Sequence, residues 1–158
     1  MRSPTLPVVM QHSRDLELGR IEYRGRITNA EVIAILEYQL AHQEWLAYDT
    51  VNLITADAEG GALHPAHLDA ILANYATLFA PTDLLIFRRS AWINLSPALQ
   101  PVVDHWINRR NTGGGQTLEA RQFKSFAETV PWLKLPANAA TLLETGEGFQ
   151  ELARYEQA

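Results

Sequence analysis

Cysteine is absent from this chain of 158 residues. Its absence excludes disulfides, thiolate metal sites and thiol nucleophiles. It also fits a reducing compartment, and we expect a cytoplasmic protein. Long apolar runs are missing too, since no stretch reaches the roughly 18 apolar residues of a membrane-spanning helix. The first residues, M-R-S-P-T-L-P-V-V-M, lack the apolar core of a signal peptide.

An excess of positive charge is also missing. The chain has 13 Lys and Arg against 18 Asp and Glu, which gives a formal net charge of −5. An acidic chain is repelled by phosphate backbones unless it carries a local basic patch. The compact basic pairs, Arg88-Arg89 and Arg109-Arg110, are too small for that role. We therefore expect no nucleic acid partner.

Two common catalytic signatures are absent as well. No G-x-S-x-G nucleophile elbow occurs, and the serines have no nearby pattern of histidine and acid. The stretch N-T-G-G-G, residues 111–115, lacks the Gly-Lys-Ser/Thr of a phosphate loop and follows a predicted helix instead of opening one. We assign no catalytic residue and expect no cofactor.

The hydrophobic pattern alternates strands with helices. Strands are predicted at Leu6–Gln11, Leu18–Tyr23, Thr50–Ala56, Asp83–Phe87 and Thr117–Phe123. Helices are predicted from Thr28 to Gln43, from His64 to Phe79, after Ser96-Pro97 and from Ser125 to Leu133. This order predicts an α/β fold, with an N-terminal strand pair followed by alternating helix–strand units. The central sheet should be largely parallel or mixed, with helices packed on it.

The chain length fits one domain. We place an α/β domain at residues 1–135 and a C-terminal helical extension, packed on the same domain, at residues 136–158. In the extension, Gly146 and Gly148 interrupt one or two small helices.

Three motifs in order carry a family resemblance. They are G-R-I-T-N-A-E at residues 25–31, N-L-I-T-A-D at residues 52–57 and S-F-A-E-T-V-P-W-L-K at residues 125–134. Over about Leu6 to Leu133 the chain resembles the SpoIIAA-like family, small bacterial domains related to the STAS anti-sigma-factor antagonists. The resemblance implies a single α/β domain of that build. The antagonists' phosphorylatable turn has no counterpart, because D-A-E-G-G-A-L-H-P contains no serine or threonine.

The stretch from Val51 to His67 is the first candidate site. A strand there leads into Asp57, two glycines, His64 and His67. In open α/β sheets, ligands bind beyond the carboxyl ends of the strands, where Asp57 falls. Imidazoles with a carboxylate can hold a metal ion. The structural alternative, which we favour, is a turn braced by Asp57 and a helix capped by His64, with no metal.

The second candidate is an anion site at Asp57, Arg88, Arg89 and Trp92. If Arg88 and Arg89 end the strand Asp83–Phe87, they share a crevice with Asp57, and arginine suits carboxylates and phosphates. The apolar stretch Ser90–Leu95 is interpreted as a loop, with Trp92 as a lid or partner contact. The alternatives for the arginines are a salt bridge to Asp57 or Glu59, or plain solvation, and the alternative for Ser90–Leu95 is a stretch folded back on the core.

These candidates lead to three functional hypotheses. We favour a non-enzymatic binding or regulatory domain that acts through protein contacts, with a protein partner or a second copy of the chain. A small anionic or lipid-like ligand would bind at the carboxyl edge of the sheet, through Asp57, Arg88, Arg89 and Trp92. The second hypothesis is a metal-dependent enzyme using Asp57, His64 and His67, and the third is a structural homo-oligomer module.

Overall fold

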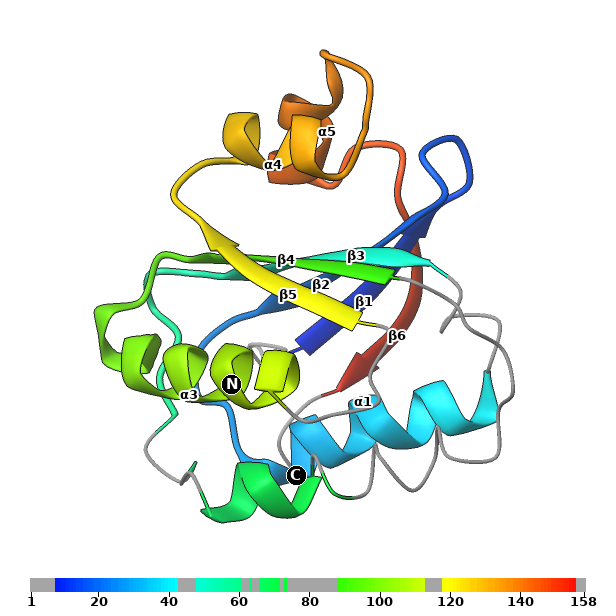
Figure 1. Ribbon diagram of the computed structural model, residues 1–158. Coiled ribbons are helices and arrows are strands. Elements are labelled where there is room, and N and C mark those ends of the chain that lie inside the picture. Colours follow the sequence, from blue (N-terminus) through cyan, green and yellow to red (C-terminus); the bar gives the residue numbers. More distant parts are fainter. Residues whose placement is uncertain are drawn as a thin grey trace.

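A six-stranded mixed sheet forms the centre of the molecule (Figure 1). The computed structural model describes residues 8–42, 48–60, 63, 66–71, 73, 88–112 and 118–155. The strands are β1 (Val8–Ser13), β2 (Leu18–Tyr23), β3 (Asp49–Ile54), β4 (Arg88–Asn94), β5 (Leu118–Phe123) and β6 (Gln150–Tyr155). They lie in the order β5-β4-β3-β2-β1-β6.

Strand direction divides the sheet into two parts. Strands β2, β3, β4 and β5 pair in parallel, so their carboxyl ends meet at one edge. Strand β1 pairs antiparallel with β2 and with β6. The predicted α/β class and N-terminal strand pair are therefore confirmed, and β2 has the predicted bounds.

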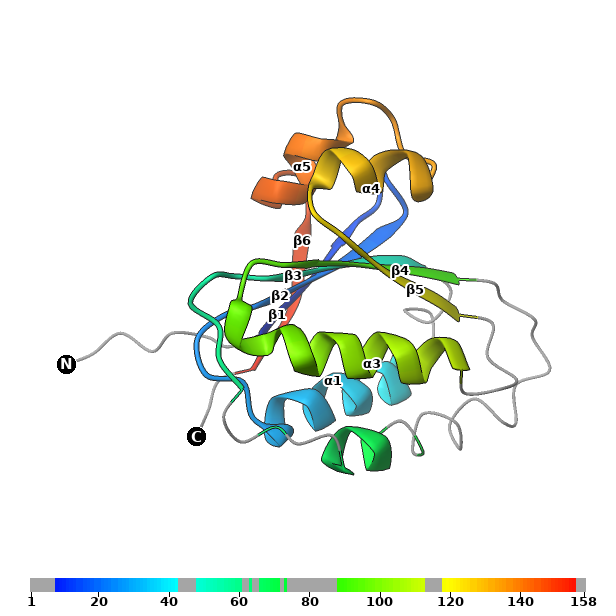
Figure 2. The same cartoon turned by 60° about the vertical axis from the view of Figure 1, so that its left-hand side comes forward.

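Helices cover both faces of the sheet (Figure 2). One face carries α1 (Asn29–Ala41) and α3 (Gln100–Thr112), the latter preceded by the 3-10 turn η2 (Pro97–Leu99). The other face carries α4 (Phe126–Trp132) and α5 (Ala139–Thr145). Each face has its own cluster of buried apolar residues, as expected when both sides of a parallel sheet are covered. No helix in the described ranges is long and apolar enough to cross a membrane.

Three of the predicted helix starts are present, and the start of the predicted helix His64–Phe79 lies outside the described residues. The Glu31 carboxylate accepts a hydrogen bond from the Thr28 backbone N–H at 2.8 Å, which is one half of a capping box. The Ser96 hydroxyl accepts from the Leu99 N–H, and the Ser125 hydroxyl accepts from the Glu128 N–H, both at 3.3 Å. Side chains that satisfy first-turn N–H groups thus set where these helices begin.

Two predictions about elements were wrong. The stretch Ser90–Leu95 is not a loop, because Ser90–Asn94 belongs to β4, which begins at Arg88. The last segment is not wholly helical, since β6 follows α5 and forms the sheet edge beside β1. The apolar run Asp83–Phe87, predicted as the strand itself, lies outside the described residues. The sequence of Ser90–Asn94 was interpreted as part of a loop, but backbone pairing with β3 and β5 makes this stretch a strand.

Candidate functional site

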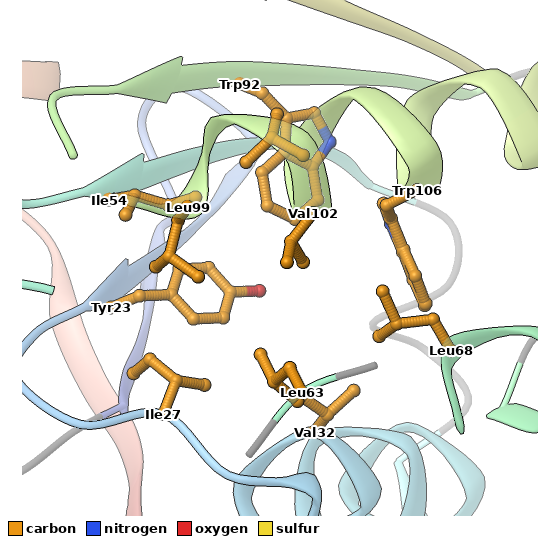
Figure 3. A pocket seen from close by; sticks show the side chains of 11 residues that line it. Tyr23, Ile27, Val32, Ile54, Leu63, Leu68, Trp92, Leu99, Val102 and Trp106 are labelled. Carbon is orange, nitrogen blue, oxygen red and sulfur yellow. The ribbon is translucent and has the colours of Figure 1, made fainter. Parts of the chain in front are cut away.

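An apolar pocket lies between the sheet and the helices α1 and α3 (Figure 3). Its cavity has a volume of about 70 Å³, and none of the described side chains that line it carries a charge. The floor comes from the carboxyl ends of the parallel strands, with Tyr23 ending β2 and Ile54 ending β3. This is the edge at which α/β sheets bind ligands.

Two aromatic rings shape the sheet side of the pocket. Tyr23 and Trp92 stack across β3, with ring centroids 5.8 Å apart and an interplanar angle of 22°. The Tyr23 hydroxyl points into the enclosed space (Figure 3). The Trp92 side chain lies on the α3 face because residues alternate between the two faces along β4. Its indole Nε1 is buried and has no hydrogen-bond partner in the described part of the chain.

A buried polar network lies beside the aromatic pair. The Asn52 amide donates to the Ser90 hydroxyl at 3.0 Å and to the Ala91 carbonyl at 3.2 Å. Its oxygen accepts from the Tyr23 hydroxyl at 3.4 Å. Thr50 donates to the same Ser90 oxygen at 3.2 Å. Buried polar groups paired in this way fix the Tyr23 ring and the adjoining strands in one arrangement.

Helices and loops provide the remaining walls of the pocket. Helix α1 contributes Val32, and α3 contributes Val102, Val103 and Trp106. Connecting segments contribute Ile27 and Leu63, the helical segment 66–71 contributes Leu68, and η2 contributes Leu99. A Cβ at position 60 would lie 2.5 Å from Leu99 Cδ2 and 3.0 Å from Leu63 Cδ1, so a larger residue in place of Gly60 would displace these two side chains of the lining.

Asp57 lies at the same edge of the sheet as the pocket but does not line it. Its carboxylate is exposed and accepts a hydrogen bond from the Thr55 hydroxyl. The adjacent backbone is tied to the loop after β2: the Glu59 N–H donates to the Gly25 carbonyl, and the Ile27 N–H donates to the Glu59 carbonyl, both at 2.7 Å. This part of the candidate stretch is therefore a turn held in place by backbone pairing.

The candidate metal ligands are not brought together in the part of the chain that is described. There, no three His, Asp or Glu side chains are grouped as a metal site requires. His67 is exposed, and its Nδ1 lies 2.8 Å from the Asn29 amide nitrogen. His64 lies outside the described residues, so the metal hypothesis stays a prediction.

Arg88 and Arg89 lie at the opposite edge of the sheet from Asp57. They begin β4 instead of ending a strand, and the Arg89 N–H donates at 2.7 Å to Oδ1 of Asp49, the first residue of β3. Asp57 follows the other end of β3, about 20 Å away for a six-residue strand. The shared crevice therefore rested on a wrong strand assignment, and anion binding by these arginines stays a prediction.

On the α4 face of the sheet, Arg89 lies over an aromatic ring. Its guanidinium carbon is 5.8 Å from the Trp132 ring centroid, and that of Arg121 is 5.5 Å away. Arg121 also pairs with Glu119 at 3.6 Å. Cation–π contacts of this kind attach the side chains of β4 and β5 to helix α4.

A surface ion pair joins the helical segment 66–71 to α3. Asp69 Oδ1 lies 2.9 Å from His105 Nε2 and accepts from Arg109 Nε at 3.1 Å. The hydrogen bond from His105, with the charge of Arg109, lowers the pKa of Asp69 below its ordinary value. The unfolded chain then binds the proton more readily than the folded chain, so the contribution to stability is present above about pH 3.9 and is lost as the pH falls through the folded-state pKa.

Asp69→Asn is accordingly expected to lower the midpoint of thermal unfolding slightly at pH 7, by about 2 °C or less, because exposed pairs contribute little. The difference from the parent should shrink as the pH falls below about 3.9 and through the lower folded-state pKa of Asp69, because the parent then loses the charge of this side chain. Thermal unfolding followed by circular dichroism across this pH range tests it. Asp15→Asn is the control, since Asp15 is exposed and has no ion pair among the described residues. A difference that persists unchanged in acid would contradict the expectation.

The sequence pointed to the edge of the sheet at which the pocket lies but to few of the residues that line the pocket. Trp92 was predicted to contact a ligand, and it does line the pocket. Tyr23 was assigned only to the strand Leu18–Tyr23, and Trp106 was not predicted to contact a ligand. Interpreting Ser90–Asn94 as a strand would have placed Trp92 on one face with Ser90 and Asn94, under the helices.

No family model, no curated protein and no solved structure matches this chain. The resemblance to the SpoIIAA-like family therefore stays a prediction, and the function has to be argued from the site itself.

Proposed function

We propose that this chain is a non-enzymatic binding domain that takes a small apolar or lipid-like ligand in the pocket below Tyr23 and Trp92. One observation carries the proposal: a cavity of about 70 Å³, with an uncharged lining, lies at the carboxyl edge of the parallel strands. Interiors of proteins are close-packed, and voids larger than a water molecule are few. Pockets at this edge are the usual ligand sites of open α/β sheets.

The size of the cavity limits the ligand. An apolar cavity of about 150 Å³ holds benzene and stays free of water. The pocket here has about half that volume, so it suits a five-membered ring or the end of an aliphatic chain. Two ligand classes were predicted, anionic and lipid-like. The uncharged lining supports the lipid-like class, because an ionised group would lose its hydration without a compensating partner.

Protein contacts belong to the same proposal. Of the stretch Ser90–Leu95, the residue that is largely exposed is Leu95, at 50% of its surface. It follows β4 directly, and its N–H donates at 2.8 Å to the carbonyl of Ile54, which lines the pocket. A partner that contacts Leu95 would therefore lie next to the edge of the sheet at which the ligand would bind.

Blocking the pocket tests the proposal. Methyl resonances of Leu99, Val102 and Val103 in the parent are expected to shift saturably on titration with methylenecyclopentane. In Val102→Phe, the new ring occupies the cavity, and affinity should fall at least tenfold, about 1.4 kcal/mol. Methyl-selective NMR measures the shifts of the lining residues that remain in each variant.

The matched control is Ile33→Phe, which places the same ring on an α1 side chain that is 41% exposed and does not line the pocket. It should bind the probe as the parent does. The proposal fails if the parent shows no saturable shifts, or if a folded Val102→Phe variant binds the probe with unchanged affinity.

A further inference from the structure

We infer that the pocket selects its ligand by size, and that Gly60 sets the upper limit. The apolar group that enters would be no larger than a five-membered ring or the end of an aliphatic chain. The absence of a side chain at position 60 keeps the cavity open, so a larger residue there would narrow it. This inference rests on the proposed function, and it specifies the size class of the ligand.

Glycine at position 60 answers a need for space. Its φ is not positive, unlike the φ of Gly25, Gly146 and Gly148, so a left-handed backbone is not the reason for glycine here. A Cβ would lie 2.5 Å from Leu99 Cδ2, a separation that Cβ atoms essentially never show, and 3.0 Å from Leu63 Cδ1. Either the main chain or these two side chains must therefore move when a Cβ is added.

The main chain around Gly60 is held by hydrogen bonds on both sides. The Glu59 N–H donates to the Gly25 carbonyl, and the Ile27 N–H donates to the Glu59 carbonyl, both at 2.7 Å. The Gly60 carbonyl accepts from the Leu63 N–H at 2.9 Å. A shift of this segment away from Leu99 would break these bonds, so the main chain is the less mobile part.

A buried serine fixes the spacing between this segment and the turn that carries Leu99. The Ser96 hydroxyl donates to the Ala58 carbonyl at 2.6 Å and accepts from the Leu99 N–H at 3.3 Å. Ser96 is only 1% exposed, and it caps η2, which ends at Leu99. With both main chains tied to one hydroxyl, the Leu99 and Leu63 side chains have to yield.

The cavity is the space into which these side chains can move. Leu63 and Leu99 both line it, and both are buried in the apolar cluster on this face of the sheet (Figure 3). Protein interiors are close-packed, so a displaced methyl group meets least resistance where a void already exists. A methyl group added at position 60 therefore reduces a cavity of about 70 Å³.

Two probes of different size test the inference. Xenon and methylenecyclopentane are both apolar, and an apolar cavity can hold xenon. The parent should bind both. In Gly60→Ala the affinity for methylenecyclopentane should fall at least tenfold, whereas the affinity for xenon should change less than threefold. Methyl-selective NMR of Val102 and Val103, which line the pocket, measures both affinities.

Gly148→Ala is the matched control. It adds the same methyl group between α5 and β6, where a Cβ would meet no atom within 4 Å. Its φ of +83° makes alanine unfavourable, so this variant is destabilised without a change in the pocket. It should bind both probes as the parent does, which separates filling of the cavity from a loss of stability.

A second pair of variants tests position 60 where space is available. Leu99→Val removes the Cδ2 atom that the new methyl group would meet, so Gly60→Ala should fold in that background. Leu99→Val should bind methylenecyclohexane, a larger ring that the parent excludes. The double variant should bind methylenecyclohexane at least tenfold more weakly than Leu99→Val does, and should bind methylenecyclopentane within threefold of the parent.

The outcomes separate this inference from the proposed function. If the parent binds neither xenon nor methylenecyclopentane, both are overturned. If the parent binds methylenecyclopentane and a folded Gly60→Ala variant binds it equally well, the inference fails and the binding pocket stands. Equal losses of both probes in Gly60→Ala, or equal binding of methylenecyclohexane by Leu99→Val and the double variant, also overturn the inference.

Discussion

Replacing Arg20 by alanine is expected to lower the free energy of unfolding by about 3–5 kcal/mol. The Arg20 side chain is only 3% exposed, and its guanidinium donates to Gln11 Oε1 at 2.7 Å and to Glu22 Oε1 at 3.1 Å. It also donates to the Leu143 carbonyl at 2.8 Å and to the Glu144 carbonyl at 3.0 Å, in the last turn of α5. Removing the Arg20 guanidinium therefore takes the donor away from all of these acceptors at once.

Arg20 stays charged although its side chain is buried. Burial, with the nearby charge of Arg24, lowers the pKa of Arg20 to about 10, so it stays protonated at neutral pH. A cation at a helix C-terminus is favourable because the last carbonyls lack partners within the helix. Arg20 thus attaches β2 to α5 through these carbonyls, which no apolar residue could bind.

Urea unfolding followed by circular dichroism measures the loss. Arg24→Ala is the matched control: Arg24 also binds Glu22, but its side chain is 46% exposed, and its removal should cost less than about 1 kcal/mol. Arg20→Lys should fall between the two, because it keeps the charge and loses the fork-shaped set of donors. Equal losses in Arg20→Ala and Arg24→Ala would contradict the expectation.

Leu143→Ala is expected to cost about 2–5 kcal/mol, the second large effect. Leu143 is fully buried in α5 and belongs to the cluster formed with Leu18 of β2 and Val51 of β3. Truncation removes apolar contacts and leaves a cavity that the rigid sheet cannot close. Because the contacts join α5 to the sheet, the variant should still unfold in one transition.

Thermal unfolding, with near-UV and far-UV circular dichroism compared, tests both statements. Leu152→Ala is the control, since Leu152 in β6 is 39% exposed, and it should cost no more than about 1 kcal/mol. A separate early transition in Leu143→Ala would show that the segment containing α5 unfolds independently, contrary to the prediction that residues 136–158 form an extension packed on the same domain.

The two faces of β2 connect stability with the proposed function. Arg20 and Glu22 face α5, whereas Ile21 and Tyr23 belong to the apolar cluster on the α1 side. Side chains alternate along the strand, so one strand carries both the polar attachment of α5 and an aromatic wall of the pocket. Fixing β2 from one face therefore holds Tyr23 in position on the other.

Local chemistry explains the parts of the fold that were predictable. The alternating pattern of Leu18–Tyr23 and the capping residues Thr28, Ser96 and Ser125 act within a few residues of themselves, so sequence reasoning placed those elements well. Strand β4 was misplaced because Asp83–Phe87 has the more apolar composition, while Ser90–Asn94 obtains its strand conformation from neighbours on both sides. Such neighbours are distant in sequence.

The amino-acid sequence by itself determined the α/β class, the N-terminal strand pair, the helix starts and the exclusion of cysteine chemistry. These follow from periodicity, capping and composition, which require no knowledge of distant contacts. Only the tertiary structure decided that Trp92 stacks on Tyr23, that Arg20 binds the end of α5, and that Arg89 and Asp57 lie at opposite edges. Strand order and register set these relations, because they bring together residues that are far apart along the chain.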